Sequence, residues 1–241
     1  MINRAVRYLP ILKLLQAESL PRQSILEVGS GPQGMGEYYP RCFVGCDVTF
    51  EARPKHPMVP VVASALQLPF ENSSFDAVIA SDVLEHVPPQ QRRDLVRETL
   101  RVARKIVLIG FPCGPRAYAL DQRLWADYRR LKRPAPPWLE EHMLYPFPNE
   151  GLFEGIDHSW AVRSIGNDNL RFHYWIERRM MRFRWQYLFD ILEKLIPRLL
   201  ERFLRLAARE PCYRRIFALT RKTEPPLEQE IVRSSVEEGN G

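Results

Sequence analysis

Three closely spaced glycine residues follow a short apolar segment near the start of the chain. Ser24 to Val28 has the composition of a buried strand, and Gly29, Gly31 and Gly34 come directly after it. Small residues at such a turn let the backbone approach a ligand closely. A glycine turn also serves simply to join a strand to a helix, so the spacing alone indicates a ligand site only weakly.

An acidic residue at the end of the next apolar segment strengthens the ligand interpretation. Cys42 to Val48 is predicted as a second strand, and Asp47 lies twenty positions after Glu27. A carboxylate at that place can accept hydrogen bonds from both hydroxyls of a ribose. Residues 27–48 therefore predict an adenosine-containing ligand, and both dinucleotides such as NAD and S-adenosylmethionine satisfy that prediction.

The elements that would position this site alternate between helix and strand. An amphipathic helix over residues 1–22 precedes strands predicted at 24–28, 42–48, 59–62, 77–80 and 105–111. A helix is predicted over residues 89–104, because apolar and polar residues recur at helical spacing there. Its inward residues would be Leu95, Thr99 and Val102, and its outward residues Arg92, Arg93, Arg97 and Arg101. This alternation predicts an α/β protein with an open, doubly wound sheet.

Three motifs in a fixed order resemble the class I S-adenosylmethionine-dependent methyltransferases, in particular their small-molecule branch. They are Glu27-Val28-Gly29-Ser30-Gly31-Pro32, then Leu68-Pro69-Phe70 with Ser74-Phe75-Asp76, and then Asp82-Val83-Leu84-Glu85-His86-Val87. The resemblance covers residues 24–113. It makes a dehydrogenase the least favoured reading, because the second and third motifs have no role in a dinucleotide site. It implies a Rossmann-like sheet of seven strands in the order 3-2-1-4-5-7-6, with the last strand antiparallel.

The resemblance also implies which residues contact S-adenosylmethionine and its product, S-adenosylhomocysteine. Glu27 and the turn from Gly29 to Gly31 would lie against the amino-acid part of the cofactor. Asp47 would bind the ribose and Leu66 would lie beside the adenine, while Ser81 and Asp82 would border the methyl-transfer pocket. The predicted cofactor-binding residues are Glu27, Gly29, Ser30, Gly31, Gly34, Asp47, Val48, Ser64, Ala65, Leu66, Ser81 and Asp82.

The sequence departs from the family at the residue expected to bind the adenine amino group. The family often has an acid before its Ala-x-x-Leu-Pro-Phe motif, and Ser64 stands at that position. A hydroxyl can accept one hydrogen bond, but a neutral acceptor is weaker than a charged one. We therefore expect Ser64 to weaken cofactor binding without abolishing it.

Methyl transfer from a sulfonium asks the protein mainly to position the acceptor and to exclude water. A general base is needed only when the acceptor is a hydroxyl that must lose its proton. His86, just beyond the predicted fourth strand, is the candidate base, and a capping or packing role for it stays open. His142, His158 and His173 lie in the segment expected to bind the acceptor, and each alone is typical of a surface or hydrogen-bonded histidine.

The composition excludes several classes of protein. The chain has 241 residues, of which 45% are hydrophobic and 27% charged, as in a globular protein. No apolar run approaches the roughly 18 residues of a membrane span, and no secretion signal is recognised. The four cysteines are scattered and lack the spacing of a metal site, so no metal and a cytoplasmic location are expected. They are Cys42, Cys46, Cys113 and Cys212.

The chain beyond residue 116 is expected to recognise the acceptor. A helix is predicted over residues 117–131, an irregular Pro-rich and Gly-rich lid over 134–155, a mainly helical basic insertion with a helix at 187–209, and a strand at 213–220. The predicted division is an N-terminal helix (1–22), a cofactor-binding core (23–116), a substrate-recognition segment with the last strands (117–222) and a disordered acidic tail (223–241).

Basic residues concentrate near the end of the chain. Residues 171–222 contain fourteen Lys and Arg against five Asp and Glu. A cationic helical face over 187–209 suits peripheral contact with an anionic membrane and a lipid-linked acceptor. Arginines interleaved with aromatic residues, such as Arg178 and Arg179 beside Trp175, suit RNA instead. A solvated charged face is the third reading.

The sequence therefore predicts an S-adenosylmethionine-dependent methyltransferase that acts on a small or lipid-linked or glycan-linked metabolite. Oxygen is the expected methylated atom, with nitrogen and carbon as alternatives. The alternatives in function are an RNA methyltransferase and a non-catalytic protein that keeps the fold as a binding module. The oligomeric state and the acceptor itself are left open.

Overall fold

The computed structural model describes residues 2–18, 20, 24–54, 56–181 and 209–222. Its strands are β1 (Ile25–Val28), β2 (Phe43–Asp47), β3 (Met58–Val62), β4 (Phe75–Ser81), β5 (Ala103–Pro112), β6 (Trp160–Asn169) and β7 (Cys212–Arg221). Its helices are α1 (Ile2–Ala17), α2 (Arg92–Val102), α3 (Gly114–Arg130), α4 (Pro137–Glu141) and α5 (Leu170–Met180), with 3-10 turns at Pro89–Gln91 and Glu150–Phe153.

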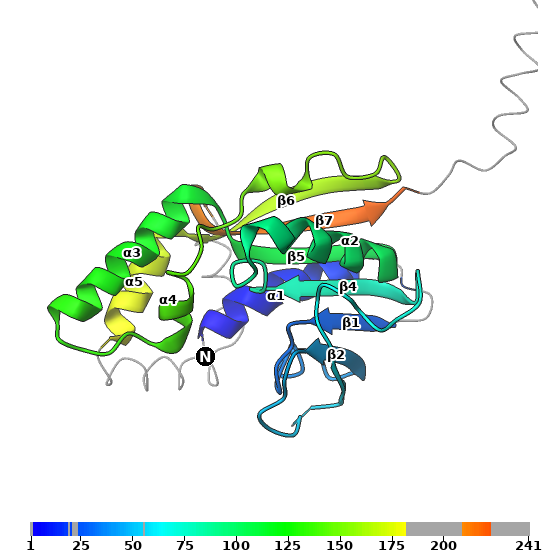
Figure 1. The fold of residues 1–241 in the computed structure, drawn as a ribbon, viewed down its shortest axis with the longest axis horizontal. Coiled ribbons are helices and arrows are strands. Elements are labelled where there is room, and N and C mark those ends of the chain that lie inside the picture. Colours follow the sequence, from blue (N-terminus) through cyan, green and yellow to red (C-terminus); the bar gives the residue numbers. More distant parts are fainter. Residues whose placement is uncertain (1, 19, 21–23, 55, 182–208, 223–241) are drawn as a thin grey trace, which may run out of the picture.

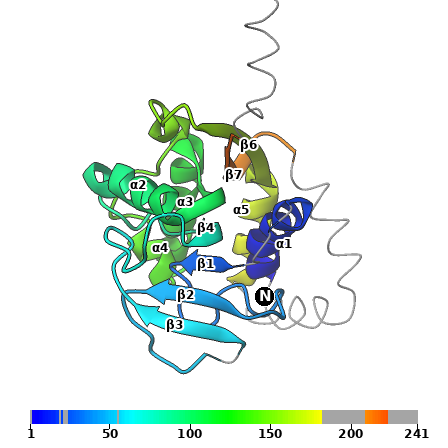
Figure 2. The same ribbon diagram turned by 90° about the vertical axis from the view of Figure 1, so that its right-hand side faces the viewer.

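The seven strands form one sheet in the order β3-β2-β1-β4-β5-β7-β6, with β3 labelled in Figure 2 and the other strands in Figure 1. Strands β1 to β5 pair with one another in parallel, whereas β7 runs antiparallel to both β5 and β6. Both the predicted strand order and the predicted antiparallel last strand are confirmed. The carboxyl ends of the parallel strands therefore share one edge of the sheet, which is where ligands bind in open α/β sheets.

Alternate side chains of the central strands face different helices. On β4, Ala77 and Ile79 belong to the core beneath α1, whereas Val78 and Ala80 belong to the core beneath α2. Figure 2 shows α1 on one face of the sheet and α2 on the other. Every residue of β4 is buried, as the near-continuous apolar run predicts for a strand covered on both faces.

The predicted inward face of helix α2 is confirmed, but one residue predicted to point outward is buried. The predicted inward residues Leu95, Thr99 and Val102 are fully buried. Arg92 was predicted to point outward, but it is buried, and its Nε donates a hydrogen bond to the Val87 carbonyl oxygen over 2.9 Å. A guanidinium can serve as a donor to loop carbonyls from within a fold, so helical spacing alone does not place an arginine in solvent.

Arg101 of α2 is partly exposed, as predicted for the outward face, but its guanidinium also holds the Leu68-Pro69-Phe70 motif. Its guanidinium donates to the carbonyl oxygens of Leu68 (3.0 Å) and Phe70 (2.7 Å). Glu98, one turn earlier, accepts from the Leu68 N–H over 2.9 Å and pairs with Arg101. The motif between β3 and β4 is thus fixed by an ion pair on α2.

Helices α3, α4 and α5 gather at the carboxyl end of the sheet (Figure 1). Leu124 of α3, Leu139 of α4 and Met181 after α5 share a hydrophobic cluster. The segment predicted as an irregular lid contains α4 and a 3-10 turn. Seven strands and a mainly helical insertion were predicted, but the sequence did not locate β6 or α5. The helix expected at 187–209 and the tail at 223–241 lie outside the described residues, apart from Arg209. Across the described ranges, no helix is both long and apolar enough to span a membrane.

Candidate cofactor cleft

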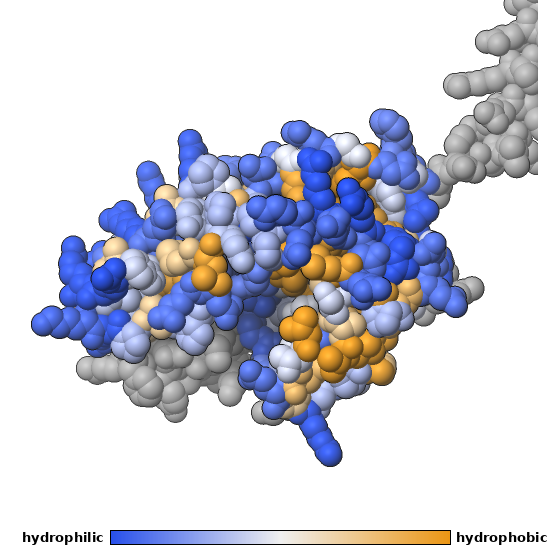
Figure 3. All heavy atoms as spheres, viewed as in Figure 1, coloured by the Kyte–Doolittle hydropathy of each residue, from blue (hydrophilic) through white to orange (hydrophobic). Residues whose placement is uncertain are grey.

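A cleft of about 570 Å³ opens at the carboxyl ends of β1, β2 and β4. The space-filling view shows the hollow between the surface over β1 and β2 and the surface around α3 and α4 (Figure 3). The predicted cofactor residues in its wall are Gly29, Asp47, Val48, Ser64, Ala65, Leu66 and Asp82. Glu27, Ser30, Gly31, Gly34 and Ser81 are predicted cofactor residues that are not part of this wall.

The turn after β1 needs glycine for two different reasons. Gly29 and Gly34 have φ of +73° and +49°, and a Cβ there would collide with Val83 Cγ2 and with Glu27 Oε2, respectively. The fold itself therefore excludes side chains at both positions. Gly31 has φ of +53°, but a Cβ on it would meet nothing within 4 Å. The protein leaves open space at Gly31, as close approach of a ligand to the backbone requires.

Asp47 is held in place by the backbone around it. Its Oδ2 accepts a hydrogen bond from the Gly31 N–H and its Oδ1 from the Val48 N–H, each over 2.7 Å. A carboxylate has about four acceptor positions, so each oxygen can still accept another hydrogen bond. The side chain is therefore oriented at the cleft wall and able to bind a pair of hydroxyls.

Glu27 is buried behind the glycine turn with one oxygen unpartnered. Its Oε2 accepts from the Met35 N–H over 2.7 Å, whereas Oε1 has no hydrogen-bond partner within the described part of the chain. Burial raises the pKa of this carboxyl to about 7, against the Met35 hydrogen bond, which lowers it. Tyr8 and Arg7 of α1 also lower this pKa, so polar groups of α1 lie close to the same carboxyl.

Ser64 has a local partner in the structure. Its Oγ accepts a hydrogen bond from the Leu66 N–H over 3.2 Å, and the side chain is exposed at the cleft. Ser30, by contrast, turns toward its own loop, because its hydroxyl donates to the Gly31 carbonyl over 3.0 Å. Ser64 therefore stabilises the turn that carries Ala65 and Leu66 into the wall of the cleft.

Asp82 ends β4 in the left-handed conformation, with φ of +55°, and two arginines hold it. Arg214 donates to both of its carboxylate oxygens, over 2.8 and 2.7 Å, and Arg7 Nε lies 2.7 Å from Oδ2. Burial alone would raise the pKa of the Asp82 carboxyl, but Arg214 and Arg7 lower it to about 2. The carboxylate is thus charged, and it ties β4 to α1 and β7.

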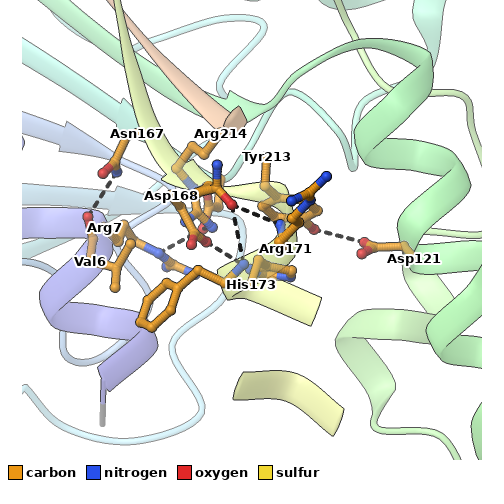
Figure 4. A network of polar contacts seen from close by, with 12 residues as sticks. Val6, Arg7, Asp121, Asn167, Asp168, Arg171, His173, Tyr213 and Arg214 are labelled. Atoms are coloured by element: carbon orange, nitrogen blue, oxygen red, sulfur yellow. Dashed lines mark hydrogen bonds and ion pairs between the residues drawn. The ribbon is translucent and has the colours of Figure 1, made fainter. Parts of the chain in front are cut away.

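A buried polar network continues from Arg214 to α3, as Figure 4 shows. Arg214 lies 3.8 Å from Asp168, whose Oδ2 is 2.7 Å from His173 Nδ1. The His173 ring stacks on Tyr213 with centroids 3.6 Å apart, and the Tyr213 hydroxyl donates to Asp121 over 2.7 Å. Sequence reasoning missed this network, because its members come from α3, β6, α5 and β7.

The histidines differ in their surroundings. His86 lines the cleft, with its Nδ1 3.1 Å from Glu141 Oε2, and burial together with nearby His142 lowers its pKa. His142 is buried, and its Nδ1 lies 2.7 Å from Asp121 Oδ2. His158 is exposed. The structure thus brings His86 to the cleft, as predicted, and places His142 beside it, with ring centroids 5.3 Å apart.

Comparisons with known proteins identify a domain type and similar folds. Residues 26–108 match the family model described as a methyltransferase domain. A magnesium protoporphyrin IX methyltransferase from Synechocystis, solved with S-adenosylhomocysteine, is similar at 13% identity and TM-score 0.51, over 92% of this chain and 84% of that one. The search of curated proteins found no match.

Two further solved structures share the fold. A phosphoethanolamine N-methyltransferase from Haemonchus contortus, in complex with phosphomonomethylethanolamine and S-adenosylhomocysteine, is 18% identical with TM-score 0.52, over 90% of this chain and 52% of that one. A small RNA methyltransferase is 14% identical with TM-score 0.55, over 92% of this chain and 25% of that one. The matched family model and the strand order identify residues 26–108 as a methyltransferase domain within a seven-stranded Rossmann-like sheet.

Proposed function

We propose that this methyltransferase transfers the methyl group of S-adenosylmethionine to an oxygen atom of a small or lipid-linked or glycan-linked metabolite. The observation that carries the proposal is the single cleft that joins the predicted adenosine-binding residues to His86 and Glu141. S-adenosylmethionine supplies an activated methyl group when it is bound. The chain then has to orient the acceptor and exclude water.

The cofactor end of the cleft is formed by the turn after β1 and the loops after β2 and β3. Asp47 would accept from the ribose hydroxyls and Ser64 from the adenine amino group, with Ala65 and Leu66 beside the adenine. Glu27 Oε1 would receive the cofactor's amino group.

The acceptor end is formed by the loop after β4 and by α4. Glu141 at the end of α4 reaches the same wall as Asp82 and His86. We therefore assign residues 23–116 to cofactor binding and residues 117–222 to acceptor recognition, with the N-terminal helix covering the sheet. The small-molecule substrates named for two of the similar structures support an acceptor of that class.

His86 is the candidate base for a hydroxyl acceptor. A lowered pKa keeps its imidazole neutral near pH 7, so that it can take a proton. An assay with methyl-labelled S-adenosylmethionine and a panel of hydroxyl-bearing lipids, glycans and metabolites tests the proposal. His86→Ala is expected to lower turnover by about 10²-fold or more with the acceptor that emerges. Turnover at the wild-type rate would remove His86 from the mechanism.

RNA is the second candidate acceptor, and one surface favours it. On α5, the Arg179 guanidinium lies over the Trp175 ring at 4.4 Å from its centroid, with Arg171 and Arg178 lining the same groove. Cations beside exposed aromatic rings suit phosphates and bases. Single-stranded RNA that binds with a steep salt dependence and is methylated would favour this candidate.

We also propose that residues 187–209 bind anionic membranes, which would then be the source of a lipid-linked acceptor. The cationic residues of the sequence in that range are its only support. Co-sedimentation with vesicles containing phosphatidylserine at low salt is the expected result. Failure to sediment even at low salt would count against a membrane-bound acceptor.

A further inference from the structure

Three potential metal ligands meet beside the cofactor cleft. Glu85, His86 and His142 can each place one ligand atom so that all three atoms lie within 4.8 Å of one another. Glu85 and His86 belong to the loop after β4, and His142 directly follows α4. The sequence does not indicate this cluster, because His142 is far from Glu85 and His86 in the chain and the three residues form no metal-binding spacing motif.

Glu85 is the member of the cluster that most needs a partner. Its side chain is fully buried, and neither carboxylate oxygen has a hydrogen-bond partner among the described residues. Buried carboxylates are nearly always hydrogen-bonded, paired with a charge or bound to a metal. The Glu85 Oε1 atom faces His142 Nε2 at 4.0 Å, which is close enough for both to bind one ion after a small movement.

The two histidines are oriented in the way that metal-binding histidines usually are. His142 Nδ1 lies 2.7 Å from Asp121 Oδ2, and His86 Nδ1 lies 3.1 Å from Glu141 Oε2. Ligating histidines commonly give one ring N–H to a carboxylate, which fixes the ring and leaves the other nitrogen for the metal. This arrangement leaves Nε2 of both residues as the ligand atom.

We propose that Glu85, His86 and His142 bind a divalent transition-metal ion at the acceptor end of the cleft. Two imidazoles and one carboxylate favour ions such as zinc, iron or cobalt over magnesium and calcium, which prefer oxygen ligands alone. Three protein ligands leave coordination positions open. His86 lies in the wall of the cleft, so an oxygen of the acceptor can occupy an open position.

This inference goes beyond the proposed function and does not depend on it. If an acceptor hydroxyl binds the ion, the ion lowers the hydroxyl pKa, and the proton can pass to water. His86 would then act as a ligand in place of a base. The site would select acceptors with a metal-binding oxygen, such as a hydroxyl next to a carbonyl or to a second hydroxyl.

Metal binding is measured on the full chain without an affinity tag, after removal of metal by a chelator. Zinc titrated in a calorimeter is expected to bind at one equivalent, and cobalt is expected to give a visible absorption band with the same stoichiometry. Glu85→Gln and His142→Gln are each expected to weaken zinc binding at least about tenfold. His158→Gln alters an exposed histidine away from the cluster and is the matched control.

A second readout keeps the test valid for variants that are less stable. Each variant is also titrated with S-adenosylhomocysteine, which needs a folded cleft but not the ion. Retained S-adenosylhomocysteine binding together with lost zinc binding supports the site. Absence of stoichiometric zinc binding to the wild-type chain, or equal zinc affinity in Glu85→Gln and His142→Gln, overturns it. Zinc binding without S-adenosylhomocysteine binding contradicts the proposed function and leaves the metal site standing.

Discussion

Arg214 on β7 donates hydrogen bonds to both carboxylate oxygens of Asp82 at the end of β4, and both side chains are nearly inaccessible to solvent. The two residues are 132 positions apart in the chain. Arg7 of α1 reaches the same carboxylate from the other side. Helix α1, strand β7 and the loop after β4 therefore meet on one buried charge at Asp82, which also lies in the cleft wall.

Removing that charge should destabilise the fold strongly. Asp82→Asn would leave Arg214 and Arg7 without their shared counter-ion, and breaking a buried ion pair costs about 3–5 kcal/mol. Unfolding in urea, followed by fluorescence, measures the change. Asp94→Asn is the matched control, because Asp94 pairs with Arg97 on the exposed face of α2 and such pairs contribute less than about 1 kcal/mol. Equal losses in the two variants would contradict a structural role for Asp82.

Glu27 should make stability fall as the pH rises through the neutral range. Burial raises the pKa of its carboxyl to about 7 in the folded chain, against 4.5 for an ordinary glutamate side chain. Between these values the unfolded chain binds fewer protons, so the free energy of unfolding decreases by roughly 3 kcal/mol from pH 4.5 to pH 7 and above.

Glu27→Gln should remove that part of the pH dependence. Burial raises the pKa of Glu177 to about 7 as well, so a slope of the same sign should remain in Glu27→Gln and shrink further in the double variant. Glu71→Gln replaces an exposed residue and should keep the wild-type profile. Urea unfolding at a series of pH values between 4.5 and 8 gives these slopes, and an unchanged slope in Glu27→Gln would rule out the buried, protonated carboxyl.

Gly31 should affect ligand binding far more than it affects folding. Alanine at a left-handed position costs about 1–2 kcal/mol, and a Cβ on Gly31 meets no protein atom within 4 Å. Gly155 has φ of +76° and equally open surroundings, but it lies away from the cofactor cleft. Gly31→Ala and Gly155→Ala should therefore lose similar stability, while only Gly31→Ala binds S-adenosylhomocysteine at least about tenfold more weakly. Similar S-adenosylhomocysteine affinities in the two variants would place the cofactor elsewhere.

Ser64→Asp should tighten cofactor binding. An aspartate can keep the hydrogen bond with the Leu66 N–H and also accept from the adenine amino group with a full charge. A gain of about 1 kcal/mol corresponds to roughly fivefold in affinity for S-adenosylhomocysteine. Ser64→Ala, which loses the turn contact, should bind more weakly than wild type. Calorimetry that finds Ser64→Asp unchanged or weaker would show that the assignment of Ser64 to the adenine is wrong.

The cofactor half of the molecule could be predicted from the sequence because its signals are local. The turn after β1 and Asp47 lie within one strand-turn-strand unit, and apolar runs identify the buried strands. The sequence did not locate β6, because it is an edge strand whose residues 161–164 are exposed and whose sequence lacks apolar alternation. The buried face of α2 could be predicted, whereas the positions of Arg92 and Arg101 depended on loop carbonyls that no periodicity reveals.

The acceptor half depends on contacts between residues far apart in the chain. Asp82 is hydrogen-bonded to Arg214, and Asp121 to Tyr213. Asp121 and Glu85 approach His142 because the residue after α4 lies beside α3 and the loop after β4. Each residue alone is typical of an ordinary loop or helix position. Burial without hydrogen-bond partners marks Glu85 as unusual, and that is a property of the fold.

The most direct test of whether the cleft binds S-adenosylmethionine and its product is thermal unfolding of the wild-type chain. The unfolding is measured with S-adenosylhomocysteine and, in parallel, with NAD. A ligand at about a hundred times its dissociation constant adds roughly 2.7 kcal/mol to the free energy of unfolding. For a chain of this size, that raises Tm by about 5–10 °C. We expect this rise with S-adenosylhomocysteine and none with NAD. A rise with NAD alone, or no rise with saturating S-adenosylhomocysteine, would contradict this expectation.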